Sequence, residues 1–187
     1  MARSSVRLTY EDYCAIPEDG KRHEIIGGDE YVSPSPGFLH QLICERLSRA
    51  LAEYCESQKM GVVLTAPFDV APSREDVMQP DVLYIARARM AEIRDTHLEG
   101  APDLAIEIIS PATRRVDEVV KRQRYEKFGV QEYWLIDPEN RSATIYRRAG
   151  ECFAPALEIA EAGALASPLL PGLSIALAPL FADPRRP

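Results

Sequence analysis

The chain has 187 residues, of which 46% are hydrophobic, and this length and composition predict a single domain with one core over residues 1–187. Its formal net charge of −7 excludes a protein that holds nucleic acid by bulk positive charge, but not an enzyme that reaches phosphates through a metal. No stretch resembles a membrane span or a signal peptide, and the four cysteines are scattered, so we expect a cytoplasmic protein without membrane contact.

A hairpin and one long helix dominate the first part of the chain. β-Branched runs flank Gly27-Gly28-Asp29, a strong turn signal, and predict a hairpin over residues 22–33. A proline-rich segment at 33–37 then precedes residues 38–58, whose apolar positions follow helical spacing. The other elements expected here are a short helix at 7–16, strands at 61–64 and 68–70, and a loop at 72–80.

Strands predominate in the rest of the chain, with one helix among them. Thr113 is a suitable N-cap and Gly129 a suitable residue just beyond a helix end, so we expect a helix over residues 113–128. The order of elements predicts an α/β (α+β) fold in which helices flank a mixed β-sheet, without the regular alternation of a doubly wound fold. The strands are expected at 81–85, 103–109, 130–137, 142–147 and 153–159, with a polar connection between the first two.

Two acids stand in or beside strongly apolar strands. Glu107 lies in the middle of the run 103–110, and Asp81 opens the run 81–85. Strands this apolar are covered on both faces, where an ionised side chain needs compensation. A divalent cation would compensate both acids, since Mg²⁺ is typically held by one or two carboxylates with water and substrate phosphate. The alternatives are a structural pairing of Glu107 with a buried arginine and a simple Pro-Asp turn at Asp81.

A lysine on the following helix is the third group of interest. Glu107 should share one face of its strand with Ala105 and Ile109, because successive side chains alternate. Lys121 lies two turns into the helix that follows this strand, from where a long side chain could reach over the strand end toward a metal. The alternative is a solvated lysine that pairs on the helix surface with Asp117, four residues before it.

Together these segments resemble the PD-(D/E)XK nuclease superfamily. More closely, the chain resembles the small standalone bacterial family described as putative restriction endonucleases, and the resemblance covers nearly the whole chain. It implies a restriction-endonuclease-like core, and the block at 107–138 is its most specific part. The matching segments are residues 23–28, 33–36 with His40, 79–81, 100–111, Asp117 with Lys121, 125–138 and 167–180.

The chain departs from the superfamily pattern at one position. The pattern places a lysine two residues after the strand acid, where this chain has Ile109. Lys121 matches the position from which similar members recruit the lysine instead. Glu24 and His40 match positions frequent in the family and would form the outer shell of the site. Glu24 would complete the metal coordination or orient Lys121, and His40 would contact phosphate or only hydrogen-bond the loop. A second Pro-Asp pair, at Asp103, is interpreted as a turn at the strand entry.

The resemblance implies an endonuclease that hydrolyses DNA phosphodiester bonds with the help of a metal. Asp81, Glu107 and the backbone carbonyl of Ile108 would hold Mg²⁺ or Mn²⁺, and Lys121 would position or deprotonate the attacking water, with Asp117 nearby. The need to cut two strands implies a homodimer. The competing interpretations are a nuclease-like fold that no longer cuts and acts as a nucleic-acid-binding or regulatory module, and a purely structural Glu107–Lys121 ion pair.

Overall fold

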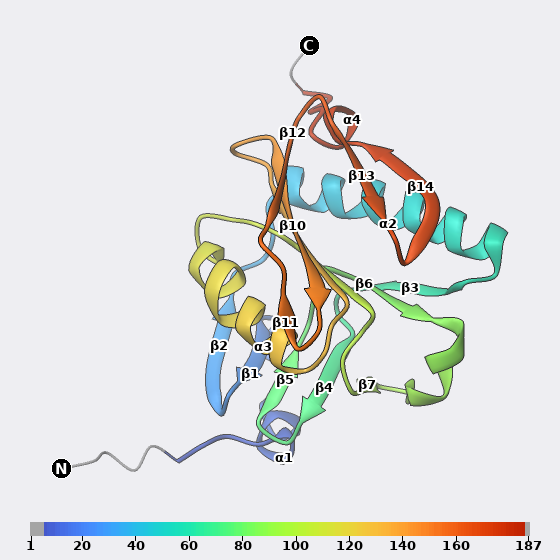
Figure 1. The fold of residues 1–187 in the computed structure, drawn as a ribbon. Coiled ribbons are helices and arrows are strands. Elements are labelled where there is room, and N and C mark those ends of the chain that lie inside the picture. The colour runs from blue at the N-terminus through green and yellow to red at the C-terminus, as the bar shows by residue number, and fades with distance from the viewer. Residues whose placement is uncertain (1–5, 186–187) are drawn as a thin grey trace.

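A seven-stranded mixed sheet forms the centre of the computed structural model, which describes residues 6–185 (Figure 1). Its strands are β3 (Gly61–Thr65), β6 (Val82–Ala86), β8 (Leu104–Ile108), β9 (Glu132–Asp137), β10 (Ser142–Ala149), β11 (Cys152–Phe153) and β12 (Leu157–Ala160). The order is β11-β10-β9-β8-β6-β3, and β12 also pairs with β10. Only β8 and β9 run parallel to each other. A mixed sheet with flanking helices was expected and is confirmed.

Both faces of the central sheet are buried under other elements. Leu104, Ile106 and Ile108 of β8 pack in the same cluster as the apolar side of helix α2 (Phe38–Gln58), whose bounds match the predicted helix. Ala105 and Ile109 point the opposite way and pack with residues of the helical segment at 114–127 that follows β8. The period-2 alternation of the strand therefore separates the two core layers, as side-chain geometry in a strand requires.

A second sheet has five strands and borders the cavity described below. Its strands are β1 (Arg22–Ile26), β2 (Asp29–Ser33), β4 (Asp69–Ser73), β5 (Asp76–Met78) and β7 (His97–Glu99), in the order β2-β1-β5-β4-β7. The predicted hairpin is confirmed, since β1 pairs antiparallel with β2 across the glycine turn. In Figure 1 this sheet lies below the central one.

The helix after β8 contains a wider turn than an α-helix. Residues 114–115 are helical, Val116–Lys121 form a π-helix (η2), and Arg122–Lys127 continue as helix α3. Thr113 lies at the start, where its carbonyl accepts from the Asp117 N–H at 3.0 Å. Gly129 ends the helix with a φ of 85°, a left-handed conformation that favours glycine, so the predicted start and end are confirmed. The π-turn inside the helix was not expected.

Three predicted stretches are more ordered or more divided than the sequence suggested. The expected loop at 72–80 contains β5, because this short segment gains strand partners on both sides, β1 and β4. The polar connection after β6 contains the 3-10 helix η1 (Arg87–Glu92) and β7. The strand expected at 153–159 is split into β11 and β12, with Pro155, which lacks a backbone N–H, in the gap.

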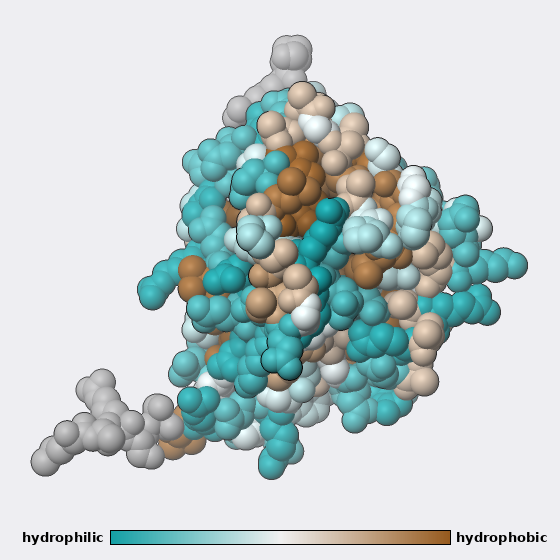
Figure 2. All heavy atoms as spheres, viewed as in Figure 1, coloured by the Kyte–Doolittle hydropathy of each residue, from teal (hydrophilic) through white to brown (hydrophobic). Residues whose placement is uncertain are grey.

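The C-terminal segment covers the remaining side of the α2 core. Strands β13 (Ala164–Ser167) and β14 (Leu170–Ala176) form a hairpin, and the short helix α4 (Leu177–Leu180) follows it. Arg46 of α2 donates to the carbonyls of Pro179 and Leu180, both at 3.0 Å, which attaches this segment to the helix. On the face drawn in Figure 2, hydrophobic residues gather around β12–β14.

The remaining element is helix α1 (Tyr10–Cys14), which is the predicted N-terminal helix and ends before Pro17. Thr9 caps it through a reciprocal capping box with Asp12. Its last residues face the site cavity described below. Within residues 6–185 no helix combines the length and apolar character that crossing a membrane requires.

Candidate active site

A cavity of about 800 Å³ opens where the two sheets, α2 and the π-turn meet. Its walls come from the end of α1 and the loop after it, from the proline-rich segment at 33–37, and from residues 110–113. Buried and half-buried ionisable groups form its floor. Those that line it are Arg22, His40, Asp81, Glu107, Asp117 and Lys121, whereas Glu24 does not line the cavity and contacts the floor from behind.

Asp81 lies directly before β6 and is held from three sides. Its Oδ2 accepts from the backbone N–H of Ile108 at 2.8 Å and lies 3.1 Å from His40 Nε2. Its Oδ1 accepts from Arg22 at 2.8 Å. Burial alone would disfavour the charged form, but the hydrogen bond from His40 and the charge of Arg22 hold the pKa of Asp81 below its ordinary range. Asp81 is therefore an ionised carboxylate fixed in orientation.

Glu107 and Lys121 form a buried pair. Lys121 Nζ lies 2.9 Å from Glu107 Oε1, and the Tyr125 hydroxyl donates to the same oxygen at 3.2 Å. Only 1% of Glu107 and 2% of Lys121 is exposed. Complete burial raises the pKa of Glu107 well above its ordinary value, against the opposing charge of Lys121. Burial opposes the charge of Lys121 too, but the carboxylates of Glu107 and Glu24 raise its pKa, so the ammonium stays charged.

Glu24 reaches the same lysine from β1. Its Oε1 lies 2.8 Å from Lys121 Nζ and accepts from the backbone N–H of Gln79 at 2.7 Å. β1 pairs with β5, which immediately precedes Gln79, so the pairing of these two strands sets the position of Glu24. The ammonium of Lys121 is thus held between two carboxylates from different sheets.

The π-turn aligns three side chains of the helix on the site. In an α-helix, positions four apart overshoot a full turn by about 40°. The wider π-turn between Asp117 and Lys121 turns less per residue and offsets the overshoot of the α-turn from Lys121 to Tyr125. All three side chains are consequently buried toward the cavity floor. Burial raises the pKa of Asp117 to about 6, although Lys121, 3.9 Å away, opposes the rise.

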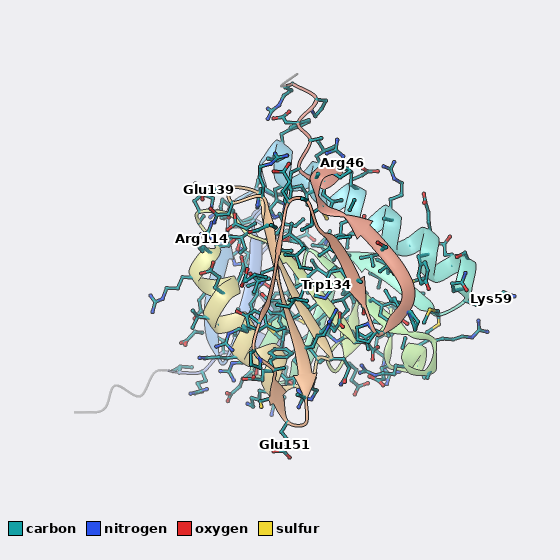
Figure 3. All side chains as sticks on the ribbon, turned by 45° about the horizontal axis from the view of Figure 1, so that its top comes forward. Arg46, Lys59, Arg114, Trp134, Glu139 and Glu151 are labelled. Atoms are coloured by element: carbon teal, nitrogen blue, oxygen red, sulfur yellow. The ribbon has the colours of Figure 1, made fainter. Side chains whose placement is uncertain are left out.

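A cluster of one arginine and three acids fixes the start of this helix to the end of β9. Arg114 donates to Asp137 at 2.8 Å and to Glu118 at 3.0 Å, and its second nitrogen reaches Glu139 at 3.2 Å. Figure 3 shows Arg114 and Glu139 close together beside the helix. Because Asp137 ends β9, the parallel neighbour of β8, the cluster sets where the helix begins relative to Glu107.

Arg22 is a functional candidate that the sequence reading did not single out. It shares a face of β1 with Glu24, two residues on, and its guanidinium contacts Asp81, Glu24 and Glu107. One nitrogen also donates to the carbonyl of Gln79. In the sequence, the only indication is that Arg22 lies two residues before Glu24, which places both side chains on the same face of a strand. The structural alternative of an arginine near Glu107 is thus present in the molecule together with the predicted lysine.

The charge of the cluster suits a divalent cation. Four carboxylates (Glu24, Asp81, Glu107 and Asp117) face two cationic side chains (Arg22 and Lys121), which leaves 4 − 2 = 2 negative charges when all are ionised. Within residues 6–185 no three Cys, His, Asp or Glu side chains are arranged to hold an ion by themselves. An ion here would therefore depend on Asp81, Glu107, the Ile108 carbonyl and water, an all-oxygen set of the kind that Mg²⁺ prefers. One guanidinium already contacts both acids, so a single cation fits between them.

Two other residues considered from the sequence lie outside the cavity. Ile109, at the position of the superfamily lysine, is packed in the core among residues that include Tyr125. Asp103 lies at the opposite end of β8 from Glu107, where it accepts from the backbone N–H of Ala86 at 2.8 Å and lies 3.3 Å from Arg89. Asp103 therefore serves the strand entry, and Asp81 is the Pro-Asp acid at the cavity.

Comparisons with known proteins identify the family of the chain and a similar fold. The family model Uma2, described as "Putative restriction endonuclease", matches residues 10–178. The fold is similar to a crystal structure described as "a putative nuclease belonging to DUF820" from Anabaena variabilis, with a TM-score of 0.81 and 20% sequence identity over 93% of this chain and 97% of that chain. At that identity the similarity shows a shared fold. No curated protein matches the chain.

Proposed function

Because the chain belongs to the Uma2 family, described as "Putative restriction endonuclease", we propose that it is a divalent-metal-dependent endonuclease that hydrolyses DNA phosphodiester bonds. One observation carries the proposal: a single cationic group contacts both Asp81 and Glu107, while Lys121 touches Glu107 from the other side. Two acids that share a cation beside a lysine are the parts that metal-assisted phosphodiester hydrolysis needs.

Asp81, Glu107 and the backbone carbonyl of Ile108 would hold Mg²⁺ or Mn²⁺. When bound, such an ion lowers the pKa of a coordinated water and offsets the charge that builds on the phosphate. His40 and the Ile108 N–H keep Asp81 ionised and oriented through its Oδ2. Glu24 holds the ammonium of Lys121 at the floor of the cavity, where Lys121 positions the attacking water.

Asp117 completes the set as a proton acceptor near the lysine. Its pKa of about 6, raised by burial, lets it exchange a proton near neutral pH, and it lies 3.9 Å from Lys121 Nζ. Its position on the π-turn keeps it in line with Lys121. In this proposal Lys121 stays charged, and Asp117 takes up the proton that the water loses.

The proposal extends to the partners of the protein. Cleavage of both strands of DNA needs two sites, so we propose a homodimer that meets its DNA in the cytoplasm. Each protomer would contribute one copy of the cavity described above. Light scattering of the purified protein tests this part, since a monomer at the concentrations that support cleavage contradicts it.

A cleavage assay tests the main proposal. Plasmid DNA is incubated with purified protein and Mg²⁺ or Mn²⁺, and Asp81→Asn, Glu107→Gln and Lys121→Met are compared with the wild type. Each change should reduce the cleavage rate by about a hundredfold or more, because each removes a metal-holding or water-positioning group. Asp103→Asn is the matched control, since it alters the other Pro-Asp acid outside the cavity, and it should keep the wild-type rate.

The outcomes separate the competing interpretations. Cleavage that persists in all three site variants would place the activity elsewhere and contradict the proposal. A wild-type protein that binds Mn²⁺ and DNA yet cuts neither DNA nor RNA would identify a nuclease-like binding module instead. A protein that binds no Mn²⁺ would leave Glu107 and Lys121 as a structural ion pair.

A further inference from the structure

The guanidinium of Arg22 uses the carboxylate oxygens that a metal ion would need. Asp81 has one oxygen, Oδ2, engaged by His40 and the Ile108 N–H, while its other oxygen, Oδ1, accepts from Arg22 at 2.8 Å. The two carboxylate oxygens of Glu107 also have different partners. Its Oε1 is held by Lys121 and Tyr125, and its Oε2 lies 3.7 Å from Arg22.

Arg22 and a metal ion would therefore compete for the same carboxylate oxygens of Asp81 and Glu107. An ion coordinated by both acids would approach Asp81 Oδ1 and Glu107 Oε2, which among residues 6–185 contact no side chain other than Arg22. Two cations cannot occupy this position together, because like charges a few ångströms apart repel strongly in a buried site. Metal binding therefore requires the guanidinium of Arg22 to move.

Arg22 is less enclosed than Lys121, and it has donors to offer once it leaves the two acids. Its side chain is 24% exposed, whereas that of Lys121 on the same carboxylate is 2% exposed. Its Nε is buried and has no hydrogen-bond partner among residues 6–185. Arg22 also lines the cavity that would receive the substrate. A guanidinium released here could present its planar set of donors to a phosphate.

We propose that Arg22 is an exchangeable internal cation: it neutralises Asp81 and Glu107 in the metal-free protein, and a divalent metal displaces it so that its guanidinium binds the phosphodiester of the substrate. The inference rests on the proposed function. It makes metal and substrate binding interdependent, since the phosphate stabilises the displaced arginine and the displaced arginine leaves room for the metal. Such coupling must be reciprocal.

The exchange predicts that loss of Arg22 strengthens metal binding. Mn²⁺ affinity is measured by calorimetry in the absence of DNA for the wild type, Arg22→Met, Glu107→Ala and the control Arg147→Met. Arg147 is matched because it also faces a buried acid, lying 3.1 Å from Glu132, but it does not line the cavity. Arg22→Met should bind Mn²⁺ roughly tenfold more tightly than the wild type, because no positive charge competes for the two acids. Arg147→Met should match the wild type.

A second titration tests the phosphate half of the inference. The probe is a short DNA oligonucleotide with phosphorothioate linkages, which resists cleavage. It should raise the Mn²⁺ affinity of the wild type by a larger factor than that of Arg22→Met, because only the wild type gains a released guanidinium in addition to the phosphate oxygens. If Arg22→Met is unfolded by circular dichroism, Arg22→Gln takes its place, since glutamine also lacks the positive charge but keeps a side-chain hydrogen-bond donor.

Failure of this inference differs from failure of the proposed function. An Arg22 variant that binds Mn²⁺ no more tightly than a wild type that does bind it would show that Arg22 does not compete, and would overturn the inference alone. Equal oligonucleotide effects in wild type and variant would overturn the phosphate contact. A wild type that binds no Mn²⁺, or a Glu107→Ala protein with wild-type affinity, would overturn the proposed function and the inference with it.

Discussion

Replacing Lys121 by methionine tests how the buried charges depend on one another. Methionine fills nearly the same space as the lysine stem but leaves Glu24 and Glu107, at 2.8 and 2.9 Å from the ammonium, without their shared cation. Removal of one partner of a buried ion pair costs about 3–5 kcal/mol, because the remaining charge is uncompensated. We therefore expect Lys121→Met to lower the free energy of unfolding by that amount at neutral pH in EDTA, measured by urea denaturation.

A double-mutant cycle isolates the pair. When Glu107→Gln is added to Lys121→Met, one unpaired carboxylate is removed, so the double variant should be more stable than the sum of the single effects by about 2 kcal/mol. Lys127→Met is the control, since this lysine is exposed on the same helix, and it should change stability by about 0.5 kcal/mol or less. Additive single effects, or a loss below about 1 kcal/mol in Lys121→Met, would refute a buried and coupled lysine.

Three further changes probe other parts of the structure. Burial raises the pKa of Asp117 from 3.8 to about 6. Between these two pH values the folded protein keeps a proton on Asp117 that the unfolded chain has lost. The stability that this group contributes is therefore present at low pH and is lost as the pH rises through about 6. Asp117→Asn should therefore gain about 3 kcal/mol relative to wild type between about pH 4 and pH 7 in urea titrations, and a constant difference would contradict the pKa. Gly129→Ala should cost about 1 kcal/mol, measured in the same way, because its φ of 85° strains any side chain, although a Cβ atom at this position would meet no atom of non-adjacent residues within 4 Å. An unchanged midpoint would argue against this conformation. Leu47→Ala, at a fully buried position of α2, should cost about 2–5 kcal/mol while the folded protein keeps its Mn²⁺ affinity, and an altered affinity would show that the core and the site are not separate.

Local patterns predicted the elements that have strong periodicity or strong end signals. The helix at Phe38–Gln58 follows from its apolar spacing, and the end of α3 follows from Gly129. The alternation in β8 placed Glu107 on the face opposite Leu104 and Ile106, and the packing clusters divide in the same way. These predictions succeeded because each depends on neighbours within a few residues.

Features that depend on distant pairing could not be read from the sequence. Segment Asp76–Met78 is a strand because β1 and β4 flank it, and no local pattern at 72–80 contains that information. Arg22 meets Asp81 and Glu107 only because the hairpin packs beside the start of β6 and the end of β8. The π-turn that aligns Asp117 with Lys121 likewise has no local signal, since its sequence is compatible with an ordinary α-helix.

The most direct test of the central claim is the position of a bound Mn²⁺ ion in crystals of the protein, located by anomalous diffraction. The claim is that Asp81 and Glu107 hold one divalent ion at the cavity floor. It predicts a single strong peak within about 2.2 Å of an oxygen from each acid and near the Ile108 carbonyl, with Arg22 displaced from both. A map with no peak between these carboxylates while Arg22 keeps its contacts, or a peak elsewhere in the molecule, would contradict it.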